Sequence, residues 1–136
     1  MRSIEIITDG EHEEMANTYQ CLTLASLNET LKKHGIVDKD LRERICSDFL
    51  FDHCYRFDAG WFEQEGLRLY PQLCFAERVQ DPEQNLGDAQ VLHIQSQDYG
   101  LHDSAFGNAD WYFEDHLEDS SEIKTGSYQQ ADEPAA

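Results

Sequence analysis

The chain has 136 residues, 28 of them acidic and 10 basic, which gives a formal net charge of −18 at pH 7. This acidity argues against bare nucleic acid and anionic membrane surfaces as direct ligands. The length is typical of one domain, and 40% hydrophobic residues are enough for a packed core. Because the sequence lacks an apolar run of roughly 18 residues, we expect no transmembrane helix.

The acidic residues are unevenly distributed along the chain. Residues 1–80 contain 15 acids and 9 bases, hence a formal charge of −6, and residues 81–136 contain 13 acids and 1 base, hence −12. No lysine or arginine occurs between Val79 and Ile123. Charge asymmetry of this kind bears on the partners of a protein rather than on its fold.

The N-terminal part of the chain predicts a strand followed by a long helix. Isoleucines within residues 4–7 favour a short strand, and Thr8 with Glu11 matches a capping box at the start of a helix over residues 10–34. Glutamates occupy the first turns of this helix and lysines its last turn, as the helix dipole favours. Gly35, followed by an isoleucine, predicts a Schellman end in the left-handed conformation.

A second helix is predicted to start at Asp38 or Asp40 and to run to about Phe57. Apolar side chains recur there at steps of three and four residues and predict one buried face. This face consists of Leu41, Ile45, Cys46, Phe49, Leu50, His53, Cys54 and Phe57. The short link between the two helices predicts an antiparallel helical hairpin. Phe51 and Tyr55 lie on the other side and are expected to form an exposed or partly exposed patch for a partner or a homodimer.

Alternating apolar residues then predict two strands. Residues 67–79 favour one strand, in which Pro71 requires an edge position, a bulge or a split, and residues 89–95 favour the other. The two strands predict an antiparallel pair around a turn-rich loop. Trp61 and Phe62, just before them, are interpreted as part of the core and of the turn that covers it.

The C-terminal part of the chain gives weaker signals. Residues 98–109 are rich in glycine and loop formers, and residues 110–118 fit either a strand or a short helix. Residues 119–136 are polar and predict a disordered, mobile acidic tail. Together the elements predict an α+β fold, in which an N-terminal antiparallel helical hairpin packs on a small antiparallel sheet. We expect one domain over residues 1–118, followed by the tail.

The four cysteines indicate a cytoplasmic protein with reduced thiols. Cys21, Cys46, Cys54 and Cys74 form no CxxC motif, and three of them lie within apolar patterns. A free cysteine behaves as a small buried hydrophobe, and a chain of this size needs no disulfides. The N-terminus does not resemble a secretory signal, which also favours the cytoplasm. Acidic and aromatic neighbours disfavour Cys54 as a catalytic nucleophile.

The acidic C-terminal segment predicts a surface for a basic partner protein. Carboxylates on a rigid surface can occupy a basic cleft that normally holds phosphates, as in immunity proteins and nuclease inhibitors, and such binding is fast and sensitive to salt. The candidate partner-binding residues are Asp98, Asp103, Asp110, Trp111, Glu114, Asp115 and Glu118. Simple hydration of an acidic surface is the alternative.

The histidines support a second hypothesis, a small metal-binding protein or metal-dependent enzyme. Imidazole and carboxylate groups suit divalent metals such as zinc. The candidate ligands are His53, His93, His102 and His116, which would have to converge from separate elements because no HExxH spacing is present. No Walker loop, GxGxxG or GxSxG motif occurs. We therefore expect an interaction protein without a cofactor rather than an enzyme.

Overall fold

The computed structural model describes residues 4–8, 10–77, 79, 90–114 and 123–126. Its elements, in chain order, are β1 (Glu5–Ile7), α1 (Glu11–Lys33), α2 (Lys39–Ala59), β2 (Phe62–Gln64), β3 (Leu67–Leu69), β4 (Cys74–Glu77), β5 (Val91–Ile94), the 3₁₀ helix η2 (Leu101–Ser104) and α3 (Ala105–Phe113). The predicted α+β class is confirmed. The predicted loop over 80–88 and most of the predicted tail over 119–136 lie outside the described residues.

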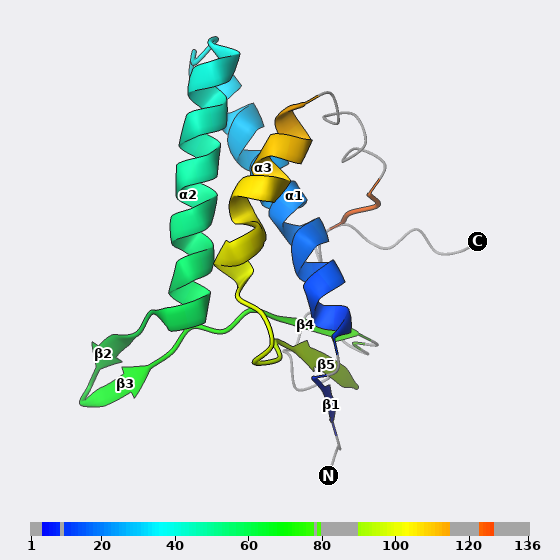
Figure 1. Ribbon diagram of the computed structural model, residues 1–136. Coiled ribbons are helices and arrows are strands. Elements are labelled where there is room, and N and C mark those ends of the chain that lie inside the picture. The colour runs from blue at the N-terminus through cyan, green and yellow to red at the C-terminus, as the bar shows by residue number, and fades with distance from the viewer. Residues whose placement is uncertain (1–3, 9, 78, 80–89, 115–122, 127–136) are drawn as a thin grey trace.

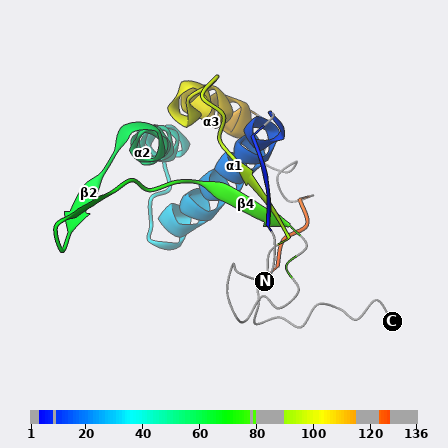
Figure 2. The same cartoon turned by 90° about the horizontal axis from the view of Figure 1, so that it is seen from below.

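The helices gather on one side of the molecule and a three-stranded sheet lies at their lower end (Figure 1). The strand order is β1-β5-β4, with β1 parallel and β4 antiparallel to β5. The prediction of a purely antiparallel sheet is therefore wrong, because the N-terminal strand pairs with β5 in the parallel direction. The β2–β3 hairpin forms a separate sheet that projects away from the helices in both views (Figures 1 and 2).

The sequence signal for the end of α1 is confirmed, whereas the signal for its start is wrong. Gly35 has a φ of 91°, and the Ile36 N–H donates to the Leu31 carbonyl oxygen over 3.0 Å, as in a Schellman end. At the start, Gly10 has a φ of 103° and no side chain caps the helix. The helix begins at Glu11 with Gly10 in the N-cap position, so Thr8 lies two residues before the position of a capping side chain.

Asp38 begins α2 as predicted, since its carboxylate accepts hydrogen bonds from the Asp40 N–H (2.9 Å) and the Leu41 N–H (3.4 Å). The most deeply buried side chains of α2 then follow at every fourth position. They are Arg42, Cys46, Leu50 and Cys54. Phe49 is 47% exposed, so its predicted place in the core is wrong.

A buried arginine explains why the inner face of α2 differs from the predicted one. The Arg42 guanidinium donates to Asn28 Oδ1 of α1 (2.8 Å) and to the carbonyl oxygens of Ile36 (2.9 Å) and Val37 (2.8 Å). With these partners the charged group can lie inside the turn between α1 and α2. The predicted buried face, which was based on apolar residues, includes position 49 and does not include position 42.

Helix α3 completes the core, and its presence changes the predicted arrangement. The closest helix contacts are those of α2 with η2 and α3, and α1 packs on α2, α3, β4 and β5. The buried cluster consists of Ala16, Leu24, Cys46, Leu50, Cys54, Leu101, Ala105, Ala109, Tyr112 and Phe113. The prediction of loop structure over residues 98–109 is wrong from Leu101 onwards, where η2 and α3 form. Residues 110–113 are helical, which is one of the two predicted alternatives. Within the described residues, no helix is long and apolar enough to cross a bilayer.

Pro71 divides the predicted strand over residues 67–79 into two strands that belong to different sheets. The segment before it is β3, which pairs with β2, and the segment after it is β4, which pairs with β5. β2 was not predicted. Its hairpin turns at Glu65 and Gly66, whose φ angles are 52° and 80°, as in a two-residue turn of type I′.

Candidate functional site

The outer side of η2 and α3 carries most of the described candidate partner-binding residues. Leu101, Ala105, Ala109, Tyr112 and Phe113 face the core, and the helical period leaves the other side in solvent. We call this side the acidic–aromatic face, which consists of Asp103, Phe106, Gly107, Asp110, Trp111 and Glu114. Phe106 is 47% and Trp111 41% exposed. Three carboxylates and two large rings thus share one helical surface whose sequence contains no lysine or arginine.

The remaining candidate partner-binding residues do not extend this face within the described residues. Asp98 is exposed, but it lies in the loop before η2. Asp115 and Glu118 lie outside the described residues.

Gly107 lies in the middle of the acidic–aromatic face, where the fold does not require a glycine. A Cβ atom built at this position would meet nothing within 4 Å. Glycine within a helix costs roughly 0.5–1 kcal/mol relative to alanine. A residue that weakens its helix without improving the packing of the domain is typical of a binding surface, where a missing side chain allows close approach.

A row of aromatic side chains connects the acidic–aromatic face to α2. The Phe106 ring stacks on Phe51 with centroids 5.0 Å apart, and Phe51 stacks on Tyr55 at 6.4 Å. His102 contacts the edges of both α2 rings, at 5.3 Å from Phe51 and 5.2 Å from Tyr55. Tyr55 is exposed and Phe51 is partly buried against α3, so the prediction that the two rings share an exposed or partly exposed patch is confirmed.

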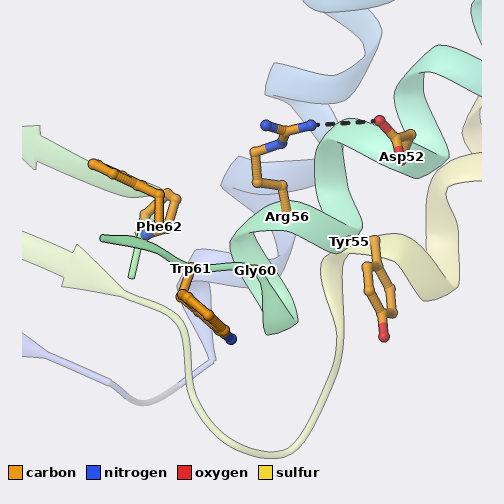
Figure 3. A pocket seen from close by; sticks show the side chains of 7 residues that line it. Asp52, Tyr55, Arg56, Gly60, Trp61 and Phe62 are labelled. Carbon is orange, nitrogen blue, oxygen red and sulfur yellow. Dashed lines mark ion pairs between the residues drawn. The ribbon is translucent and has the colours of Figure 1, made fainter. Parts of the chain in front are cut away.

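A cleft of about 320 Å³ lies at the end of this row, where α2 meets the β2–β3 hairpin. Its lining residues are Asp52, Tyr55, Arg56, Gly60, Trp61, Phe62 and Pro71. In Figure 3, Tyr55 and Trp61 lie on either side of the turn at Gly60 and point in the same direction. Trp61 is 50% and Phe62 48% exposed, so their interpretation as core residues is wrong.

A buried carboxylate holds the start of η2 beneath these surfaces. Asp58 Oδ1 accepts hydrogen bonds from the Leu101 N–H (2.9 Å) and Gln95 Nε2 (2.9 Å), and Oδ2 accepts one from the His102 N–H (2.8 Å). The His102 ring contacts the same Oδ2 through Nδ1. Burial acts to raise the pKa of Asp58, but the hydrogen bonds from His102, Gln95 and Leu101 outweigh it and lower that pKa.

The sequence did not reveal the role of Asp58. Asp58 directly follows the predicted second helix, and its carboxylate reaches the Leu101 N–H across 43 residues of sequence. The available signal was weak: a single acid at the last turn of a helix, where the helix dipole disfavours negative charge. Hydrogen-bond donors from another segment of the chain stabilise the Asp58 carboxylate.

The structure does not bring together the three described candidate metal ligands, His53, His93 and His102. His53 stacks on Phe49 (5.4 Å) and packs edge-on against Phe57 (5.0 Å). His93 is buried in β5 with Nε2 2.5 Å from Glu77 Oε2, and His102 pairs with Asp58. His116 lies outside the described residues. Among the described residues, no group of three histidine, cysteine, aspartate or glutamate side chains could hold a metal ion.

Another buried histidine ties α1 to the segments around the sheet. His12 Nε2 lies 2.8 Å from the carbonyl oxygen of Leu73, so this nitrogen must carry the proton and donate it. Nδ1 is then the acceptor for the Tyr99 hydroxyl. Burial, together with the charges of Glu13 and Asp58, raises the pKa of Tyr99 to about 12, which keeps the hydroxyl in its donating form.

The cysteines are free thiols, and Cys21, Cys46 and Cys54 are buried. Burial, reinforced by the charge of Asp58, raises the pKa of Cys54 to about 12. This agrees with the expectation that Cys54 is not an activated nucleophile, because a reactive thiol requires a lowered pKa.

No family model, curated protein or solved structure matches this chain.

Proposed function

We propose that this protein is a cytoplasmic interaction module whose acidic–aromatic face binds a basic partner protein, and that it acts as an inhibitor or immunity-type protein by covering a basic cleft of that partner. The observation that carries the proposal is the outer face of η2 and α3, where Asp103, Asp110 and Glu114 share an exposed helical surface with Phe106 and Trp111. Aromatic residues are enriched at protein interfaces, and carboxylates around them give charge complementarity with a basic surface.

Electrostatic attraction would dominate the encounter with such a partner. The chain carries a net charge of −18, and more than half of the negative excess belongs to residues 81–136. Charges of this size accelerate association at low ionic strength and lose much of their effect when salt screens them. Trp111 and Phe106 would then provide the buried contacts that salt does not weaken.

The rigid position of α3 also supports the proposal. Asp58 fixes the start of η2 through the Leu101 and His102 N–H groups, and Tyr112 and Phe113 anchor the other end of the segment in the core. A surface that is ordered before binding loses less conformational entropy in the complex.

A capture experiment tests the proposal. The protein is immobilised, lysate of its own organism is applied at low salt, and bound proteins are eluted with a salt gradient. We expect one basic protein to elute at higher salt than the bulk of nonspecifically bound cationic proteins. The variant Asp110→Asn/Glu114→Gln should lose about tenfold or more in affinity, since close charge pairs contribute about 1.5 kcal/mol or more each.

A matched variant controls for net charge. Glu14→Gln/Glu29→Gln removes the same number of exposed carboxylates from α1, away from the acidic–aromatic face. Equal losses in the two variants, or a mixture of abundant basic proteins like that retained by an acidic protein of matched composition, would mean that the acidity serves only hydration.

A further inference from the structure

The β2–β3 hairpin exposes more apolar surface than any role within the described fold requires. Every residue from 61 to 70 is exposed. The register pairs Phe62 with Leu69 and Gln64 with Leu67, so three apolar side chains lie on one face of the hairpin. An isolated two-stranded hairpin is at best marginally stable, and an uncovered apolar face is typical of an interaction site.

The cleft at the base of this hairpin is built from half-exposed rings in fixed positions. Tyr55 is 49% exposed, and Trp61 points in the same direction from the far side of Gly60 (Figure 3). The Arg68 guanidinium packs over the Trp61 ring at 3.9 Å from its centroid and so limits its movement. Gly60 itself cannot be larger, since a Cβ atom would lie 2.7 Å from the Arg56 carbonyl oxygen.

The charge of the whole chain, rather than that of the cleft lining, favours a basic ligand, since Asp52 and Arg56 line the cleft with opposite charges and Arg68 lies over Trp61. Asp52 lies 3.7 Å from Arg56, but both side chains are mostly exposed, and such a surface pair contributes little. The Asp52 carboxylate is thus able to exchange Arg56 for a cation of a ligand. The net charge of −18 favours a basic ligand and opposes a second copy of this chain.

The shape of the cleft favours an extended segment over a folded domain. The cleft holds about 320 Å³, which is room for a few side chains of one segment. Proline-rich segments dock in shallow grooves lined by aromatic rings, because the polyproline II conformation is already extended and loses little entropy on binding. Tyr55 and Trp61, with Pro71 beside them, provide such a groove.

We infer that the cleft between α2 and the β2–β3 hairpin binds a proline-containing, positively charged extended segment of the basic partner. This inference rests on the proposed function, since it assigns to the same partner a second contact. Prolines pack between Tyr55 and Trp61, and a neighbouring arginine or lysine pairs with Asp52. The aromatic row through Phe51 and Phe106 makes the cleft continuous with the acidic–aromatic face.

Paired peptides test this inference. An array carries arginine-containing peptides of about ten residues, roughly three turns of polyproline II, with the arginines at different positions. Each peptide has a partner in which alanines replace the prolines. Binding is measured in solution through the fluorescence of Trp61 in a Trp111→Phe background. We expect the tightest proline peptide to bind at least tenfold more tightly than its alanine counterpart.

Two variants decide whether the cleft is the binding site. Tyr55→Ala should weaken the proline peptide at least tenfold, whereas Phe49→Ala, which removes an equally exposed ring from another side of α2, should leave its affinity unchanged. The inference fails if the alanine peptides bind equally well, if both variants lose affinity alike, or if no peptide shows saturable binding up to about 1 mM.

The two proposals fail in different ways. Suppose that Tyr55→Ala captures the basic partner as well as the wild type does, while Asp110→Asn/Glu114→Gln does not. The cleft inference is then refuted and the proposed function stands. Suppose instead that proline peptides occupy the cleft but no specific basic protein is captured from the lysate. The proposed function is then refuted, and the cleft remains a peptide-binding site.

Discussion

Replacing Asp58 by asparagine should destabilise the protein at neutral pH. The carboxylate accepts hydrogen bonds from the N–H groups of Leu101 and His102 and from Gln95 Nε2, and it pairs with the His102 ring. Asparagine retains one oxygen, which can still accept the hydrogen bonds from the Leu101 N–H and Gln95 Nε2. Its NH₂ group then faces the His102 N–H, so a buried donor meets another donor in place of an acceptor.

The size of the loss follows from these contacts. A hydrogen bond to a charged group contributes about 1.5–3 kcal/mol, and a buried donor left without a partner costs about 1–3 kcal/mol. The two effects overlap because they concern the same oxygen, Oδ2. We therefore expect Asp58→Asn to lower the free energy of unfolding by about 2–4 kcal/mol.

Urea unfolding over a range of pH tests this expectation. The pKa of Asp58 is lowered from its ordinary value of 3.8, so its carboxylate stabilises the fold fully above that pH and loses the effect as pH falls through the folded pKa. The difference between the wild type and Asp58→Asn should be full at pH 7 and shrink below pH 3.8. Asp52→Asn, which removes an exposed carboxylate 3.7 Å from Arg56, should cost less than about 1 kcal/mol. A loss below about 0.5 kcal/mol for Asp58→Asn, or a difference that does not change with pH, would refute the reasoning.

Four further predictions concern other parts of the molecule. Gly107→Ala should raise the free energy of unfolding by about 0.5–1 kcal/mol and weaken partner capture, and unchanged capture would show that the missing side chain serves no partner. Leu50→Ala should cost about 2–5 kcal/mol in urea unfolding, whereas Phe49→Ala should cost about 1 kcal/mol; similar losses would mean that the described inner face of α2 is wrong. The raised pKa of Cys54, about 12, keeps the native thiol protonated, so alkylation at pH 8 should require unfolding, and stability should decline as pH rises from the ordinary thiol value of 9.0. The untagged protein should contain no stoichiometric zinc, and bound zinc that His93→Ala releases would favour the metal hypothesis instead.

Local hydrogen bonds account for the parts of the fold that sequence predicts well. Gly35 and Ile36 end α1, and Asp38 begins α2, through contacts within a few residues of sequence. The start of α1 shows the limit of such signals, because Thr8 and Glu11 fit the capping-box pattern while Gly10 sets the observed start. Local patterns compete, and main-chain geometry decides among them.

The elements that the sequence did not predict depend on distant contacts or on solvent. α3 contains Gly107 and several polar residues, and its small inner residues Ala105 and Ala109 become a helix face only because α2 lies against them. β2 has no buried residue to mark it, since the whole hairpin is exposed. Aromatic content led to the interpretation of Trp61 and Phe62 as core, but hydrophobicity does not distinguish a core from an exposed binding surface.

The candidate site was predictable in its chemistry and only partly in its position. Charge identified Asp103, Asp110 and Glu114, and the helical period of α3 places them on one face. The histidine hypothesis relied on convergence, whereas the structure pairs His102 with Asp58 and His93 with Glu77, each from a different segment of the chain. Whether side chains converge depends on the tertiary structure, which the spacing of residues in the sequence does not show.

The Asp58–His102 pair lies between the two proposed binding surfaces and fixes their relative position. Asp58 holds the start of η2, and the His102 ring contacts both Tyr55 of the cleft and Phe51 of the aromatic row. A partner that occupies both surfaces benefits from this geometry. Once one contact has formed, the other forms at high effective concentration only if the two surfaces are correctly placed relative to each other. Asp58→Asn should therefore weaken capture of the whole partner more than it weakens binding of a proline peptide to the cleft alone. Equal losses for the partner and the peptide would indicate that the two surfaces act independently.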